Sequence, residues 1–309
     1  MTIEEIRKLS FPKPDSHKGQ NGKLLIIGGS HLFHAASLWS LTVASRIVDL
    51  VHYCSVPENN AIVHELKKEF RNGIVIPRDN VEEYIKEDDV ILIGPGMLRM
   101  GNSKSQITNS KQIQISQLAD KLQITNVKDI EKIEDEGEQT YYLTNYLLQK
   151  YPEKQWVLDA GALQMLELPN IPKNAILTPH HREFELLLRR AEVAPPWRDS
   201  PRDSVLKFAK KYHCVVLLKG KEDVASNGEE IRIIEGGNAG MTKGGTGDVL
   251  AGLIAALTCT NDPWISTLAG SYINKKAGDE LFATVGPFFN ATDLANQIPK
   301  TMGELIRGV

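Results

Sequence analysis

The stretch "GGNAGMTKGGTGDVLAGLIAAL", residues 236–257, gathers glycines around one carboxylate, Asp248, and then continues as an apolar segment of helical character. The first N–H groups of a helix have no partner within the helix, and the helix dipole adds positive potential there. We therefore expect a phosphate-binding turn with free backbone N–H groups at Gly244, Gly245, Thr246 and Gly247. We expect the same dipole to keep Asp248 ionised, so that it can engage a substrate hydroxyl beside the phosphate.

A purely structural interpretation of these glycines stays open at this point. Thr246 or Asp248 could cap a buried helix, while the glycines allow tight packing around it. One glycine-rich pattern before an aspartate does not separate the two interpretations. The decision therefore depends on the rest of the chain.

The composition limits the class of protein. With 309 residues, of which 41% are hydrophobic and 24% charged, the chain can bury a large core. The net charge is −3 and no segment concentrates Lys and Arg, so we expect no nucleic-acid surface. The cysteines are far apart, at Cys54, Cys214 and Cys259, which favours a reducing compartment over a zinc site or a disulfide framework. Because no apolar run resembles a signal peptide or a membrane span, we expect a cytoplasmic protein with no membrane partner.

Short aliphatic runs that end in glycine or polar residues recur along the chain, with helical patterns between them. The runs are "KLLIIGG", "VHYCSVP", "GIVIP", "DVILIGPG", "WVLDAGAL", "AILTPH" and "CVVLLKG". Continuous apolar strands of this kind are typical of parallel sheets that are buried on both faces. The order predicts an α/β fold of three layers, in which helices cover both faces of a mostly parallel central sheet.

Two segments depart from this alternation. In "DVASNGEEIRII", Asn227 and Gly228 lie between two extended runs and predict a type I′ turn in an antiparallel edge hairpin. The segment at about 99–140 is rich in Gln, Asn, Ser and Lys, so little of it is expected to join a core. We interpret the chain, 1–309, as a single domain that carries this segment as a polar surface insertion.

The residues that follow the predicted strands describe a site. In open parallel sheets the ligand crevice lies beyond the carboxyl ends of the strands. The residues there are small or polar: Gly28, Gly29, Ser30, Gly94, Gly96, Asp159, Thr178, His180, Lys219 and Gly220. Some roles stay open, because Asp159 could instead cap the next helix, and His31 and His34 could face either solvent or ligand.

Several ordered motifs together resemble a known family. "NAGMTKGGTGDVLAGLIAAL" is similar to the anion-hole and catalytic signature of the ribokinase-like superfamily, and specifically of the ADP-dependent NAD(P)H-hydrate dehydratases. "KGQNGKLLIIGGS", "ILIGPG", "VLDAGAL", "ILTPHHREF" and "LLKG" agree in order. One departure follows "GGS", where the family has a glycine-containing turn and this chain has "HLFHAA".

The resemblance implies an activity and a set of site residues. Members of the family phosphorylate the hydroxyl of hydrated NADH or NADPH (NADHX or NADPHX) with ADP, or with ATP in some relatives, and Mg²⁺ serves the transfer. The phosphorylated intermediate then eliminates. By resemblance, Asp248 is the catalytic residue and also contacts the substrate, together with Ala36, Gly96 and His180. The adenine nucleotide is expected to contact Lys219, Gly220, Lys221, Glu222, Asp223, Gly245, Thr246 and Gly247.

Two other functions stay open on the sequence. A small-molecule kinase similar to hydroxyethylthiazole kinase would share the glycine turn and the aspartate, and would stop after phosphorylation. A nucleotide-binding regulator would bind without turnover. No residue is predicted to be a dedicated metal ligand, and the resemblance allows for a homo-oligomer.

Overall fold

The computed structural model describes residue 6 and residues 8–100, 124–192 and 200–307. They form a nine-stranded sheet in the order β3-β2-β1-β4-β5-β6-β7-β8-β9. The strands are β1 (Lys23–Ile27), β2 (Leu50–Cys54), β3 (Ile74–Val75), β4 (Val90–Ile93), β5 (Gln155–Leu158), β6 (Ile176–Leu177), β7 (Val215–Leu218), β8 (Asp223–Ser226) and β9 (Ile231–Ile234). From β3 to β7 every pairing is parallel, whereas β8 and β9 are antiparallel. The mostly parallel sheet predicted from the aliphatic runs is confirmed.

Alternate residues of each central strand pack on opposite faces, as the two-residue period of a strand requires. In β1, Leu25 and Ile27 pack into one apolar cluster, whereas Leu24 and Ile26 pack into another. Both clusters consist of buried residues, so both faces of the sheet are covered. This explains why the strands are continuously apolar in the sequence.

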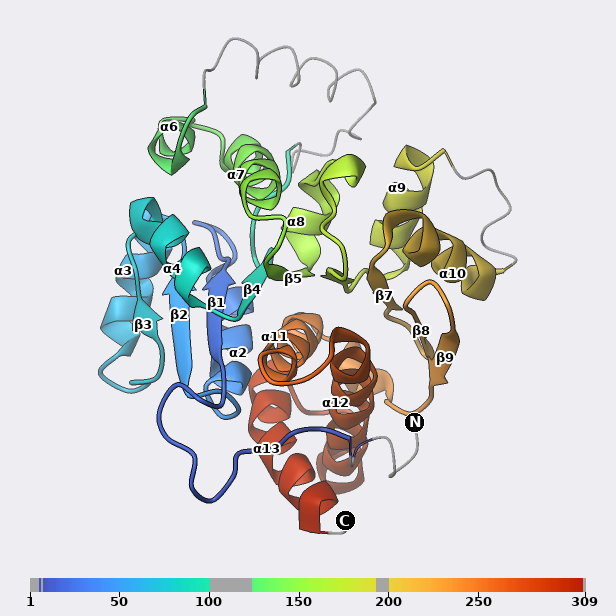
Figure 1. Cartoon of the computed structure of the whole chain (residues 1–309). Coiled ribbons are helices and arrows are strands. Elements are labelled where there is room, and N and C mark those ends of the chain that lie inside the picture. Colours follow the sequence, from blue (N-terminus) through green and yellow to red (C-terminus); the bar gives the residue numbers. More distant parts are fainter. Residues whose placement is uncertain (1–5, 7, 101–123, 193–199, 308–309) are drawn as a thin grey trace.

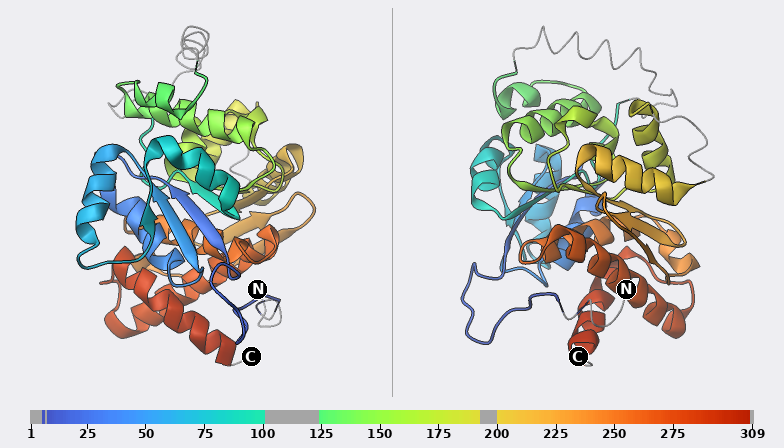
Figure 2. Two further views of the ribbon diagram at one scale, coloured as in Figure 1. Left: turned by 60° about the vertical axis from the view of Figure 1, so that its left-hand side comes forward. Right: turned by 45° about the vertical axis from the view of Figure 1, so that its right-hand side comes forward.

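Helices form a layer on each face of the sheet (Figures 1 and 2). One face is covered by α4 (Val81–Glu87), α6 (Val127–Glu131), α7 (Glu136–Lys150), α8 (Ala160–Met165), α9 (His181–Arg190) and α10 (Pro201–Tyr212). The other face is covered by α2 (His34–Ala44), α3 (Pro57–Leu66), α11 (Thr246–Thr258) and α12 (Pro263–Val285). The last helix, α13 (Ala291–Arg307), packs with α2, α11 and α12 around a third apolar cluster. The predicted three-layer arrangement is therefore confirmed.

The edge hairpin forms, but its turn differs from the prediction. Four residues, 227–230, connect β8 to β9, and only Gly228 among them has a positive φ. The side-chain oxygen of Asn227 instead accepts hydrogen bonds from the N–H groups of Glu229 and Glu230, both at 3.0 Å. The predicted type I′ turn is wrong, because this local side-chain contact stabilises a longer turn.

The predicted surface insertion at about 99–140 also needs correction in part. Residues 101–123 lie outside the described residues. In the described remainder, Val127, Ile130 and Ile133 are buried in the core cluster that also contains side chains of α7. These three apolar side chains, at helical spacing within a polar stretch, are the signal that the composition of the segment concealed.

The described residues contain no helix that is both long enough and apolar enough to cross a membrane. The longest, α12, has 23 residues but carries Lys275 and Asn274 among its buried side chains. These polar side chains face the site described next.

Candidate active site

The strand-terminal residues meet at one edge of the sheet, as the parallel arrangement requires. Gly28 donates its N–H to Cys54 at the end of β2, and Gly94 donates to Ile27 at the end of β1, both at 3.0 Å. On the other side of β5, His180 and Lys219 form an isolated parallel bridge. The predicted set of strand ends is thus brought together, at the edge from which α11 also starts.

The glycine turn begins α11 without a capping side chain. Its N-cap residue is Gly245, which has φ 96°. An added Cβ at Gly245 would lie 2.3 Å from the Trp39 ring, so the backbone approaches α2 as closely as only glycine permits. The Thr246 hydroxyl bonds the carbonyl oxygens of Met241 and Lys243, at 2.7 and 3.0 Å, and therefore holds the preceding turn. Neither Thr246 nor Asp248 is the N-cap, so the simple capping interpretation is wrong.

The prediction of four free N–H groups needs one correction. The N–H of Thr246 donates to the carbonyl oxygen of Lys243 at 3.4 Å. This bond is long, and it closes the turn that leads into α11. The first N–H groups of any α-helix, including α11, have no carbonyl acceptor within the helix. They can therefore bind an anion.

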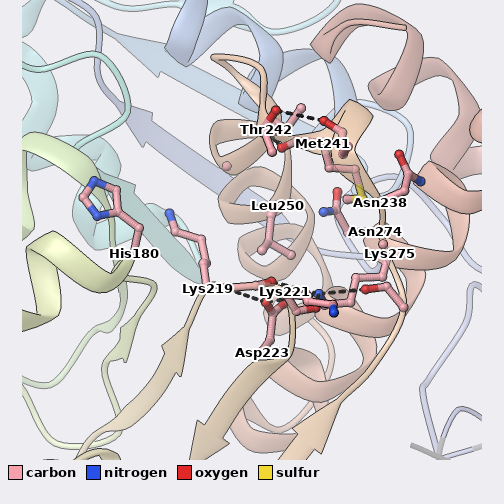
Figure 3. A pocket seen from close by; sticks show the side chains of 16 residues that line it. His180, Lys219, Lys221, Asp223, Asn238, Met241, Thr242, Leu250, Asn274 and Lys275 are labelled. Carbon is pink, nitrogen blue, oxygen red and sulfur yellow. Dashed lines mark hydrogen bonds and ion pairs between the residues drawn. The ribbon is translucent and has the colours of Figure 1, made fainter. Parts of the chain in front are cut away.

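A cavity lies on each side of this turn. The first has a volume of about 680 Å³ and includes Thr246 and Gly247 in its lining. The second has a volume of about 640 Å³ and includes Gly244, Gly245 and Asp248. Figure 3 shows the first cavity, with His180 and Lys219 on one side and Asn238, Asn274 and Lys275 on the other. Molecules bound in the two cavities would therefore approach each other at the turn.

A buried ion pair lies beside the turn. Lys219 Nζ is 2.8 Å from Asp159 Oδ1, which also accepts a hydrogen bond from the Thr178 hydroxyl at 2.8 Å. Asp159 makes no capping hydrogen bond to α8, so its side chain positions Lys219 instead. Burial lowers the pKa of Lys219, but the charges of Asp159 and Glu183 outweigh burial and hold it above the ordinary value. The Lys219 ammonium is therefore a fixed positive charge near Gly247, where an added Cβ would lie 3.3 Å from Nζ.

The expectation that the helix dipole keeps Asp248 ionised is wrong. Burial and the negative charge of nearby Asp159 raise the pKa of Asp248 to about 7, although Lys219 acts in the opposite direction. Burial likewise raises the pKa of Glu183 to about 6. Desolvation by the surrounding protein is therefore the largest influence on the pKa of both carboxyl groups. A carboxyl group that titrates near neutral pH is suited to accept and release protons.

The residues predicted to face the substrate do not all lie together. Ala36, Gly96 and Asp248 line the second cavity. Gly96, at φ 74°, brings its backbone close to Phe33 and Ala36. His180 lines the first cavity instead, where its Nδ1 caps α9 by accepting hydrogen bonds from Arg182 and Glu183.

Most of the residues predicted to bind the nucleotide line the first cavity, and two do not. The lining includes Lys219, Gly220, Lys221, Asp223, Thr246 and Gly247. Gly245 lines the second cavity. Glu222 is exposed, and its carboxylate lies 3.8 Å from the Arg202 guanidinium. Asp223 is held by Lys275 at 3.3 Å and by the Ser271 hydroxyl at 2.8 Å. The Asp223 carboxylate thus anchors the floor of the cavity.

Two residues of α12 belong to the first cavity and were not predicted from the sequence. Lys275 Nζ donates to the carbonyl oxygens of Gly220 and Lys221 in the β7–β8 loop and of Gly236 after β9, at 3.0 to 3.2 Å, and so ties together two loops. Asn274 is 4% exposed, and among the described residues its buried Oδ1 has no hydrogen-bond partner. An unsatisfied buried acceptor is costly, so this oxygen suits a ligand that carries a hydrogen-bond donor. The helical pattern of this segment did not indicate that either residue would line a cavity.

Within the described ranges, no group of three or more His, Cys, Asp or Glu side chains could hold a metal ion. Mg²⁺, however, commonly uses only one or two carboxylates together with substrate phosphates and water. An Mg²⁺ ion that enters with the nucleotide would therefore be held chiefly by phosphate oxygens and water.

Comparison with protein families identifies the chain. A family model described as NAD(P)H-hydrate dehydratase matches residues 131–300, more than half of the chain. The chain belongs to the NAD(P)H-hydrate dehydratase family. A relative from Nitrosopumilus maritimus, named ADP-dependent (S)-NAD(P)H-hydrate dehydratase, is 32% identical over 94% of this chain and 91% of its own length. The protein of the same name from Cenarchaeum symbiosum is 30% identical over 97% of this chain and 95% of its own length.

Other members of the dehydratase family are longer. The bifunctional NAD(P)H-hydrate repair enzyme of Methanocaldococcus jannaschii is 32% identical over 96% of this chain, which spans 51% of that relative. The chain thus spans about half the length of the bifunctional relatives it matches. Among solved structures, the ADP/ATP-dependent NAD(P)H-hydrate dehydratase of Bacillus subtilis, co-crystallised with ATP and Mg²⁺, superposes with a TM-score of 0.70 at 21% identity and covers 98% of this chain and 97% of its own. The ribokinase of Thermotoga maritima superposes with a TM-score of 0.54 at 10% identity and covers 91% of this chain and 99% of its own. The ribokinase-like fold is therefore shown.

The close approach at Gly245 predicts a stability effect. Gly245→Ala should lower the free energy of unfolding by about 2 to 5 kcal/mol, because it combines a left-handed backbone with a clash against Trp39. Gly244→Ala is the matched control, since no atom lies within 4 Å of an added Cβ, and it should change stability by less than about 0.5 kcal/mol. Urea denaturation measures both variants. Equal effects at the two positions would contradict the tight packing of the turn.

Proposed function

We propose that the protein dehydrates NADHX and NADPHX with ADP as the phosphoryl donor, and thereby restores the normal cofactors. The observation that carries the proposal is the turn from Gly244 to Asp248, which lies between two cavities of similar volume. A phosphoryl donor and a hydroxyl acceptor have to meet in this way for direct transfer. The names of the relatives that match nearly the full length support the choice of substrate and donor.

The first cavity suits the nucleotide. The start of α11 and the Lys219 ammonium supply positive potential for the phosphates. Asn274 offers its unsatisfied oxygen to a donor such as the amino group of adenine. Lys275 holds the loops that form the cavity floor, so its role is to position them.

The second cavity suits the hydrated nicotinamide, with Asp248 beside the hydroxyl. Asp248 accepts the hydroxyl proton as the oxygen attacks the terminal phosphoryl group, while Ala36 and Gly96 leave room for the ring. Phosphorylation makes the oxygen a good leaving group, and the ring nitrogen supplies electrons as phosphate departs. Mg²⁺ bound with the nucleotide would neutralise phosphate charge.

The direct test is to add ADP to chemically prepared NADHX and follow the reduced-nicotinamide absorbance. The proposal predicts that absorbance returns as AMP appears in equal amount. A small-molecule kinase would consume nucleotide with a small alcohol and would not restore absorbance, and a nucleotide-binding regulator would show no turnover. Either result would overturn the proposal. A cytoplasmic location and a homo-oligomeric state stay predictions.

Replacement of Asp248 tests its catalytic role. Asp248→Asn should lower turnover on the order of 10²- to 10⁴-fold while ADP affinity is largely kept, because only the proton acceptor is lost. The matched control is Asp203→Asn, which changes an exposed carboxylate in the first turn of α10 and should leave turnover unchanged. Wild-type turnover in Asp248→Asn would remove this residue from the chemistry.

The raised pKa of Asp248 predicts a pH dependence. The ionised, proton-accepting form increases with pH, so kcat/KM should rise through about pH 7 and then level off. A profile that is already flat from pH 5 upwards, at about the ordinary range of a carboxyl group, would show that Asp248 is not the titrating base.

Asn274 predicts selectivity for the base of the nucleotide. If its Oδ1 accepts a hydrogen bond from the adenine amino group, inosine diphosphate, which lacks this group, should bind more weakly than ADP by roughly 2- to 10-fold. Asn274→Leu should remove this preference. Calorimetry with the two nucleotides gives the four affinities. An unchanged preference in the variant would contradict the contact.

A further inference from the structure

The elimination step removes a carbon-bound proton as well as phosphate, and phosphorylation does not assign the acceptor of that proton. To form the carbon–carbon double bond, the ring carbon next to the phosphate-bearing carbon has to lose a proton. Asp248 has already taken the hydroxyl proton in the first step of the proposed function. Besides Asp248, the described residues that line the second cavity include one side chain with a basic nitrogen lone pair, which is His34.

A buried hydrogen-bond network fixes the ring of His34. Asn59 is fully buried and donates its two amide hydrogens to Tyr53 Oη at 2.6 Å and Ser55 Oγ at 2.9 Å. Its Oδ1, which lies 3.1 Å from His34 Nδ1, is therefore the acceptor of that pair. It follows that Nδ1 carries the hydrogen, and that Nε2 of the neutral ring holds the lone pair.

The network continues beneath α2 and leaves Asn59 little freedom. Tyr53 Oη is 2.7 Å from Ser37 Oγ, and both residues are fully buried. Because an added Cβ at Gly29 would lie 2.1 Å from Asn59 Nδ2, the end of β1 also packs tightly against this amide. This packing holds the Asn59 amide in one orientation. The orientation of the amide in turn determines which nitrogen of His34 carries the hydrogen.

Neither of the two other histidines near the strand ends can take this role. The Nδ1 lone pair of His180 is occupied by the N–H groups of Arg182 and Glu183, and its ring lines the first cavity. His31 is exposed and lies 3.0 Å from Glu136, outside the lining of the second cavity.

We propose that His34 is the proton acceptor of the elimination step and that Asn59 is its positioning residue; this rests on the proposed function. His34 Nε2 takes the proton from the adjacent ring carbon, and the electron pair of that C–H bond forms the double bond. The C–O bond breaks with its electron pair on phosphate. The step releases one phosphate and one proton and involves no change of oxidation state.

The ratio of two products tests this role. In the wild type, AMP and restored reduced nicotinamide should appear in equal amounts. In His34→Gln, AMP release should stay near the wild-type rate while the absorbance returns roughly 10²-fold more slowly or worse, so that the phosphorylated hydrate accumulates and is visible by phosphorus NMR. His31→Gln makes the same change three residues earlier and should keep the two products equal.

The outcomes separate this inference from the proposed function. If the wild type releases no AMP with the hydrate, the proposed function fails. If the wild type is active and His34→Gln keeps the products equal, whether both rates fall or neither does, His34 is not the acceptor. Should His34→Gln fail to fold, His34→Ala with added imidazole applies the same test. Imidazole should restore the absorbance step without changing AMP release, and absence of rescue in the folded variant would overturn the role.

Discussion

The buried ion pair between Lys219 and Asp159 is the interaction on which the arrangement of the site depends. It joins the end of β7 to the end of β5 at 2.8 Å, with the Asp159 side chain 2% exposed and that of Lys219 17% exposed. Separating such a pair would leave an uncompensated buried charge and would cost several kcal/mol. The pair therefore holds a positive charge beside the start of α11 and a negative charge near Asp248. The first favours phosphate at the turn, and the second helps to raise the pKa of Asp248 towards neutrality.

The second constraint is the backbone of the glycine turn. Gly245 packs against the Trp39 ring of α2, so α11 begins where helix, sheet edge and both cavities meet. A larger residue at position 245 would clash with Trp39 and push α11 away from α2. The geometry of the turn and the charge beside it thus give one boundary at which two small molecules can react.

Much of this organisation could be predicted from the sequence. The continuously apolar runs predicted the parallel strands. The glycine or polar residues after each run predicted the edge of the sheet at which the site lies, because the carboxyl ends of parallel strands lie at the same edge. What could not be predicted depends on tertiary burial. The pKa of Asp248, the cavity that His180 faces and the roles of Asn274 and Lys275 follow from neighbours that are distant in the chain. The apolar residues of 127–133 were hidden by the polar composition around them.

The location of the bound nucleotide tests the central claim most directly. A crystal structure with ADP should place the phosphates against the backbone of residues 244–247 beside Lys219, with the base towards Asn274 in the first cavity. The second cavity should then stay open to the hydrated nicotinamide next to Asp248. Nucleotide found in the second cavity, or away from the turn altogether, would contradict the account.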